Sequence, residues 1–76
     1  MTQASHHRIN GAALRAIREA QHIERPDLAR IVGIDPSYLY KIETGERRPR
    51  AWLIRPLAEA LGVPESAITH SAERVA

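Results

Sequence analysis

The sequence contains no cysteine, no phenylalanine and no long apolar run. Without cysteine the chain can form neither disulfide bonds nor thiolate metal sites, a composition that is typical of a reducing, cytoplasmic compartment. No stretch approaches the roughly 20 apolar residues that a membrane-spanning helix requires. The N-terminal MTQASHHRING also lacks the apolar core of a signal peptide. The sequence therefore predicts a cytoplasmic protein without membrane contact.

The chain is also short, with 76 residues of which 43% are hydrophobic. This length suffices for one domain and leaves no room for a second core. A domain of this size buries only about 60% of the surface that its unfolded chain exposes, so its stability depends on close packing. Residues 1–9 and 71–76 are polar and predict a flexible arm and tail on either side of a domain at residues 10–70.

Charge is small in sum but unevenly distributed. The formal net charge is +2. Seven basic and five acidic side chains lie between Glu24 and Arg55, and three of the basic ones belong to RRPR at residues 47–50. From Pro56 onward the chain has three glutamates and one arginine. This asymmetry predicts a polyanion as the partner of one face of the protein.

Helical spacing of apolar residues begins after Asn10, a residue type that commonly caps helix N-termini. A first helix is expected from about Gly11 to Gln21. Pro26 suits the first turn of a second, short helix, where the N–H that proline lacks would have no partner. Gly33 suits the end of that helix, where the chain adopts a left-handed conformation.

A third helix is expected after a turn of only two residues. Asp35 is a good N-cap, Pro36 suits the first helical position, and Gly45 ends the segment. Leu39 and Ile42 face inward while the polar side chains face outward. Two short helices joined by a glycine-bearing turn, the second with a polar outer face, are typical of a helix-turn-helix, whose second helix enters the DNA major groove.

The apolar segment AWLIRPLAEALG predicts a fourth helix. It is expected to be kinked at Pro56 or to begin there, because proline removes a helical hydrogen bond. A last short helix is expected from Glu65 to Thr69. Since no convincing strand is present, the sequence predicts an all-α domain of five helices, of which the second and third form the helix-turn-helix.

The segment LRAIREAQHIERPDLARIVGIDPSYLYKIETGERRPR resembles the lambda and 434 repressor and Cro class of helix-turn-helix domains, the XRE type. The similarity covers about Leu14 to Val63. It rests on an arginine-rich first helix, Leu-Ala followed by valine and glycine in the second, and Ile-Glu-x-Gly at the end of the third. The later LAEALGV is also similar. The resemblance implies a compact lambda-repressor-like fold and a repressor of transcription that binds operator DNA.

The resemblance places the base-reading positions of the family on the third helix, at Pro36, Ser37, Tyr38 and Lys41. Lys41 could donate to guanine, and Ser37 can donate or accept a hydrogen bond. Pro36 departs from the family pattern, because it offers only an apolar contact. Tyr38 either packs against the core or faces the groove, whereas Tyr40 is expected to be exposed near a phosphate.

Four arginines are expected to contact the DNA backbone. Arg25 occupies the position of a family glutamine that touches the backbone, and an arginine would form a stronger, charge-assisted contact there. Arg47, Arg48 and Arg50 resemble the backbone and minor-groove cations of the family. Their contribution to binding is expected to depend on salt concentration.

Glu43 is an acid in a basic region. In the resembling family this glutamate pairs with an arginine of the first helix, and the matching residue here is Arg18. We therefore expect an ion pair between Arg18 and Glu43 that braces the third helix and does not touch DNA.

The run around Trp52 and Leu53 is too apolar for all its side chains to point inward from one helix. Part of it, with Val63 and Ile68, is expected to form a subunit interface. Because one domain reads only half of a site, the expected state on DNA is a homodimer on a palindromic or pseudo-palindromic operator. Ile31 is a further apolar residue where this fold usually shows solvent, and it suggests a partner contact.

No metal site, cofactor or enzymatic activity is expected. The four histidines are scattered without the spacing of metal ligands, and no nucleophile lies in a recognisable catalytic context. A second hypothesis is an antitoxin-like protein-interaction module, whose main partner is a protein and not double-stranded DNA. DNA binding that weakens by orders of magnitude with salt would distinguish the two.

Overall fold

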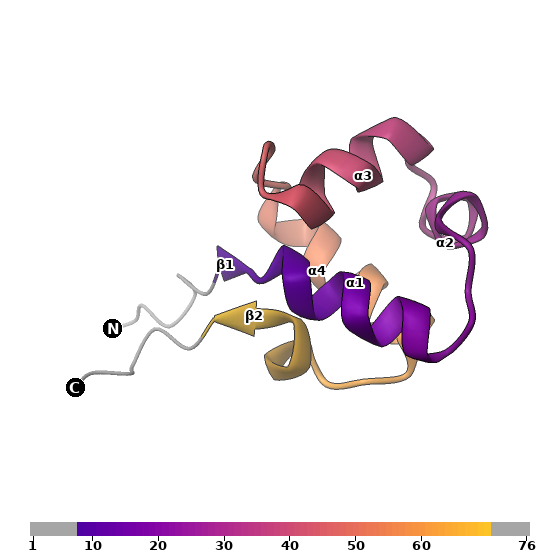
Figure 1. Ribbon diagram of the computed structural model, residues 1–76. Coiled ribbons are helices and arrows are strands. Elements are labelled where there is room, and N and C mark those ends of the chain that lie inside the picture. Colours follow the sequence, from indigo (N-terminus) through magenta and orange to yellow (C-terminus); the bar gives the residue numbers. More distant parts are fainter. Residues whose placement is uncertain (1–7, 71–76) are drawn as a thin grey trace, which may run out of the picture.

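The computed structural model describes residues 8–70 (Figure 1). Within this part the chain forms four α-helices, two 3-10 helices and one two-stranded sheet. The elements in chain order are β1 (Arg8–Ile9), α1 (Gly11–Ala20), α2 (Arg25–Val32), α3 (Pro36–Thr44), η2 (Ala51–Leu53), α4 (Ile54–Leu61), η3 (Glu65–Ile68) and β2 (Thr69–His70). The expected tail and residues 1–7 of the expected arm lie outside the described residues. No helix of residues 8–70 is long and apolar enough to span a membrane.

One hydrophobic core lies between the helices. Helix α3 packs on α1 and α2, α2 also packs on α4, and η3 lies against α1 and α4. Each fully buried leucine or isoleucine contributes roughly 1.5–3 kcal/mol relative to an exposed one. The buried hydrophobic residues are Leu14, Leu28, Ala29, Leu39, Ile42, Leu53, Leu57, Ala58, Leu61 and Ile68.

The first three helices begin and end where their sequence signals predict. The Asn10 side chain accepts a hydrogen bond from the Ala13 N–H at 3.1 Å and caps α1. Gly33 ends α2 with a φ of 88°, a left-handed conformation that glycine adopts without steric cost. The Gly33 N–H donates to the Ala29 carbonyl at 2.8 Å, which satisfies one of the last acceptors of α2. The short turn to α3 follows directly, so the predicted helix-turn-helix is present.

The regular part of the fourth helix begins close to Pro56, two residues earlier than expected. Helix α4 is one continuous segment that begins at Ile54, and Pro56 is its third residue. The first N–H groups of a helix have no partner within it, so proline costs no hydrogen bond at this position. The preceding residues form the 3-10 helix η2, which leads directly into α4.

The last element is also shorter than predicted. A 3-10 helix covers Glu65–Ile68, and Thr69 already belongs to strand β2. This strand pairs antiparallel with β1, in a register that places Arg8 opposite His70 and Ile9 opposite Thr69. Two residues that were assigned to a flexible arm therefore belong to the folded domain, and the all-α domain carries a small sheet at its ends (Figure 1).

Candidate nucleic-acid interface

Helix α3 has two chemically distinct faces. Its inner face buries Leu39 and Ile42 completely and places the Glu43 carboxylate inside the domain. Its outer face is solvent-exposed along the whole helix. The exposed residues of this face are Pro36, Ser37, Tyr40, Lys41 and Thr44. The helix thus presents polar side chains outward on a rigid apolar support.

The start of α3 is fixed by its cap. The Asp35 carboxylate accepts a hydrogen bond from the Ser37 N–H at 2.9 Å and a second from the Ser37 hydroxyl. The hydroxyl bond, followed by the backbone bond, holds the pKa of Asp35 below its usual range, because both favour the charged form. The exposed Ser37 hydroxyl donates its proton to Asp35, so its oxygen remains able to accept a hydrogen bond from outside the protein.

We expect the Asp35 carboxyl to titrate below the ordinary aspartate pKa of about 3.9. Since the folded state favours the carboxylate, the stabilisation from this cap is complete above that value and is lost as the pH falls through the lower folded pKa. Carboxyl NMR shifts during an acid titration measure the effect directly. In the matched Asp35→Asn variant the cap persists, because asparagine caps equally well, and this acid-dependent loss should disappear. A native Asp35 pKa at or above the ordinary value would contradict the cap.

Each tyrosine of α3 is paired with an arginine. Tyr38 is half-buried against the core, and the Arg47 guanidinium carbon lies 5.6 Å from the centre of its ring. Tyr40 is 45% exposed, and the Arg25 guanidinium carbon lies 5.0 Å from its ring centre. Cations at these distances are attracted by the ring face. The structure therefore orients Arg25 and Arg47 along the exposed side of α3.

The predicted ion pair between Arg18 and Glu43 is present. Arg18 donates from Nε to Glu43 Oε2 at 2.7 Å and from Nη2 to Oε1 at 3.1 Å, which is the bidentate geometry of strong arginine–carboxylate pairs. Arg18 Nη1 also donates to the Ile23 carbonyl at 2.8 Å. The Glu43 side chain has no exposed surface. A carboxylate in the interior thus joins α3 to α1.

Arg25 lies in the same network, a contact that sequence reasoning missed. Its Nε donates to Glu43 Oε1 at 3.1 Å, so one carboxylate holds arginines from both α1 and α2. Arg25 keeps 29% of its side chain exposed beside Tyr40. Arg25 therefore mainly stabilises the position of α3 through Glu43, and only the exposed part of its guanidinium faces outward. No local sequence pattern links Arg25 to Glu43, because the contact joins two helices.

The end of α3 and the following loop carry unbalanced positive charge. Lys41, Arg47, Arg48 and Arg50 are all exposed. Within residues 8–70 none of the four has an acidic partner, whereas the exposed Arg15, Arg30 and Arg55 each pair with a neighbouring glutamate or aspartate. The Arg47 N–H donates to the Lys41 carbonyl at 3.1 Å and folds the loop back onto α3. These cations therefore lie on α3 and in the loop that directly follows it.

Gly11 is a second residue whose role the sequence did not reveal. It begins α1 at the point where this helix touches the end of α3. A Cβ atom on Gly11 would lie 2.7 Å from the Glu43 carbonyl oxygen and would also collide with the Ile42 carbonyl. Only a residue without a side chain allows α1 and α3 to approach this closely.

The predicted subunit interface is partly wrong. Leu53 and Ile68 are buried in the core of the domain itself, so they are not available to a partner. The 3-10 geometry of η2 turns Leu53 inward and leaves Trp52 outside, with 60% of its surface exposed. Val63 is half-buried against the core, and Ile31 on α2 is 62% exposed.

Histidines and acids do not form a cluster in the described part of the chain. Within residues 8–70 no group of three or more potential metal ligands comes together. His22 and His70 lie in this part, whereas His6 and His7 lie outside it.

A family model described as a helix-turn-helix domain matches residues 11–70. The chain belongs to this family. This match confirms the predicted resemblance to the lambda and 434 repressor and Cro-like class and the predicted fold class.

Solved structures agree with this assignment. The restriction-modification controller protein C.AhdI from Aeromonas hydrophila is 33% identical, with 75% of this chain and 86% of that chain covered and a TM-score of 0.72. The clp gene regulator ClgR from Corynebacterium glutamicum is 30% identical, with coverage of 74% and 73% and a TM-score of 0.70. A hypothetical transcription factor from Neisseria, NHTF, is 26% identical, with coverage of 79% and 74% and a TM-score of 0.67. No curated protein matches the chain significantly.

Proposed function

We propose that this helix-turn-helix protein is a sequence-specific transcriptional repressor that reads the major groove of double-stranded DNA with α3. The observation that carries the proposal is the exposure of Ser37 and Lys41 on a helix whose other face is locked into the core. An α-helix fits the major groove, where each base pair presents a distinct pattern of donors and acceptors. Relatives named as a restriction-modification controller and a clp gene regulator support a regulatory role.

The chemistry of the outer face suggests which base edges it contacts. Lys41 is exposed and without an acidic partner in the described residues, so it can donate to O6 and N7 of guanine. The Ser37 oxygen, whose proton is held by Asp35, accepts from an adenine or cytosine amino group. Pro36 is exposed and can only pack against an apolar group such as a thymine methyl.

The surrounding cations fix the helix on the duplex. Arg47, Arg48 and Arg50 follow α3 directly, and the exposed part of Arg25 lies beside Tyr40. In the proposed complex these residues contact phosphates, which positions the protein without selecting a sequence. Tyr40 would support such a contact from the side of the helix.

Two copies of the chain are proposed to bind one operator. One α3 covers about half a site, and two-fold related domains place their reading helices about 34 Å apart on a palindromic or pseudo-palindromic duplex. Trp52 is the large exposed apolar residue nearest in sequence to the basic loop, and together with Val63 it is the proposed point of contact between copies. Sedimentation of the protein with and without a palindromic duplex tests the stoichiometry.

Selection of bound duplexes from a random pool is the most direct test of the proposal. The expected result is an enriched motif with two inverted halves. A mobility shift on that motif should weaken by several orders of magnitude between about 50 and 200 mM salt, because phosphate contacts release counterions. A pool that shows no enrichment over several rounds would refute sequence-specific reading.

Lys41→Ala and Arg48→Ala are expected to act differently. Loss of Lys41 should cost about 1–3 kcal/mol on the selected motif and relax the preference at one base step. Loss of Arg48 should weaken all sequences alike and reduce the salt slope by about one. Arg55→Ala is the matched control, since Arg55 is exposed on α4 and engaged with Glu59 at 3.3 Å. Equal effects of both variants on every sequence would remove Lys41 from the reading positions.

A second candidate is a module that binds another protein, as antitoxin-like domains on this scaffold do. The specific observation in its favour is the exposure of Ile31 and Trp52, two large apolar side chains on the surface of a small domain. Such a module would show little DNA binding at any salt concentration. The same mobility-shift series therefore distinguishes the two functions.

A further inference from the structure

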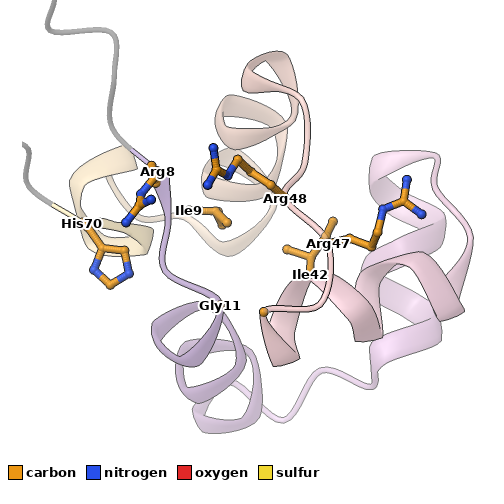
Figure 2. Close-up of a pocket in the computed structure, with 8 residues that line it drawn as sticks. Arg8, Ile9, Gly11, Ile42, Arg47, Arg48 and His70 are labelled. Atoms are coloured by element: carbon orange, nitrogen blue, oxygen red, sulfur yellow. The ribbon is translucent and has the colours of Figure 1, made fainter.

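An open hollow of about 160 Å³ lies between the small sheet, the start of α1 and the end of α3 (Figure 2). Ile9 and Ile42 are its apolar lining residues, and Arg8, Arg48 and His70 are its polar lining residues. Figure 2 shows the Arg8 side chain directed toward His70. The hollow lies beside the proposed reading helix, but two of its basic residues come from the sheet at the two ends of the domain. Neither of these two residues has a role in the function proposed above.

The sheet register explains how residues so distant in sequence meet. Arg8 on β1 is directly opposite His70 on β2. The Asn10 N–H also donates to the Ile68 carbonyl at 2.8 Å and ties the two strands to the body of the domain. Arg48 approaches from the loop after α3, and Figure 2 shows its side chain directed toward the sheet. The fold thus brings basic side chains from three separate segments around one cavity.

The charge of the lining is of one sign. It contains three arginines and one histidine and no acidic residue. Within residues 8–70, neither Arg8 nor Arg48 has an acidic partner. Arg47 also lines the hollow, but its guanidinium carbon lies 5.6 Å from the centre of the Tyr38 ring.

Main-chain carbonyls at the end of α3 border the hollow, where Ile42 is a lining residue. The Ile42 carbonyl already accepts the Gly45 N–H at 3.2 Å, and the Glu43 carbonyl is packed against Gly11. Neither therefore balances the arginine charges. A concave surface with uncompensated cations and apolar walls concentrates the positive potential and attracts anions.

We propose that this hollow binds a phosphate group. Guanidinium groups match the oxygens of phosphate in a bidentate manner, which favours this anion over a simple halide. A single water molecule needs roughly 10–15 Å³ of such volume, so the hollow can hold a phosphate together with bound water. The favoured source is a phosphodiester of the DNA backbone, an assignment that rests on the function proposed above. Arg48 belongs both to the basic loop and to the lining of the hollow. A DNA backbone bound at the loop would therefore extend over the hollow.

Titration of the full-length protein with inorganic phosphate tests the site without DNA. The measurement is the ¹H–¹⁵N NMR spectrum at constant ionic strength, with chloride as the balancing anion. In the native protein the amides of Ile9, Gly45 and His70 should shift in a saturable manner. Arg8→Ala should weaken this binding about tenfold, because a hydrogen bond to a charged group is lost. Arg8→Lys should restore part of it, and Arg55→Ala should leave it unchanged.

Two outcomes would overturn the proposal. One is a small, non-saturating shift spread over all basic residues, which indicates unspecific screening. The other is an unchanged titration in Arg8→Ala, whose exposed side chain can be removed without loss of the strand pairing. If the protein binds phosphate but no DNA, the phosphate site is supported and the repressor function is refuted. Failure of the site and failure of the proposed function can therefore be distinguished.

The source of the phosphate follows from DNA binding by the same variants. If the hollow takes a backbone phosphate, Arg8→Ala should reduce the slope of log affinity against log salt by about 0.9 relative to Arg55→Ala. The alternative result is an unchanged slope in Arg8→Ala while inorganic phosphate still binds the native protein at Arg8. In that case the hollow is a phosphate site, as proposed, but its ligand is a free phosphate compound and not the DNA backbone.

Discussion

Replacement of Glu43 by alanine is expected to destabilise the domain by about 3–5 kcal/mol. The Glu43 carboxylate is fully buried, and the Arg18 side chain beside it is 6% exposed. The substitution leaves the Arg18 guanidinium in the interior with the Ile23 carbonyl at 2.8 Å and the more distant, half-exposed Glu19 carboxylate at 3.9 Å as its remaining partners. It also removes the partner of Arg25. Because natural domains are stable by only about 5–15 kcal/mol, urea unfolding followed by circular dichroism should show a large loss.

Glu59→Ala provides the matched control for this effect. Glu59 forms an ion pair of similar chemistry with Arg55 at 3.3 Å, but both side chains are mostly exposed. Exposed pairs contribute about 0–1 kcal/mol, so this variant should unfold almost like the native protein. Similar losses in Glu43→Ala and Glu59→Ala would mean that the Glu43 pair is solvated and not a buried brace.

Arg18→Met combined with Glu43→Leu separates the charge effect from the packing effect. When both partners of a buried pair become apolar, no uncompensated charge remains, and stability often returns or increases. The double variant should therefore be more stable than Glu43→Ala, although Arg25 still lacks its partner. Its DNA binding reports whether the ion pair is needed for the orientation of α3 or only for stability.

The first three helices could be predicted because their limits depend on neighbouring residues. Asn10 caps α1 through a bond to the N–H three residues later, and Asp35 caps α3 through residue 37. Gly33 adopts the left-handed conformation that follows a helix. The exposed face of α3 was predictable for the same reason, since helical spacing alone separates Leu39 and Ile42 from the outer residues.

The remaining features depend on contacts between distant parts of the chain. Strands of two residues have no periodicity, so the pairing of Arg8 with His70 left no local signal. Leu53 is an exception, since it lies four residues before the buried Leu57 and eight before the buried Leu61, a helical spacing that places all three on one face. The family resemblance identified Arg18 as the partner of Glu43, but the additional bond from Arg25 became evident only from the packing of α2 on α3.

Replacement of Gly11 by alanine is expected to destabilise the domain by about 1–3 kcal/mol, as other additions to a tightly packed contact do. The new Cβ atom would lie 2.7 Å from the Glu43 carbonyl oxygen and 2.9 Å from its carbonyl carbon. These atoms belong to the backbone of α3, so rotation of a side chain cannot relieve the collision. Helix α1 and helix α3 must separate, and this separation strains the buried ion pair of Glu43.

Helix propensity alone predicts that Gly11→Ala increases stability. The direction of the measured change therefore decides between the two effects. Alanine is a better helix former than glycine by up to about 1 kcal/mol, so an unhindered Gly11→Ala change would stabilise α1. Ala16→Gly, on the exposed side of α1, measures the propensity effect alone. Gly33→Ala measures the cost of a left-handed conformation, since its Cβ would meet no atom within 4 Å.

If Gly11→Ala unfolds at a higher urea concentration than the native protein, the close approach of α1 to α3 does not exist in solution. If it unfolds earlier and also loses affinity for the selected duplex by more than Gly33→Ala does, the contact at Gly11 holds α3 in the orientation that reads DNA.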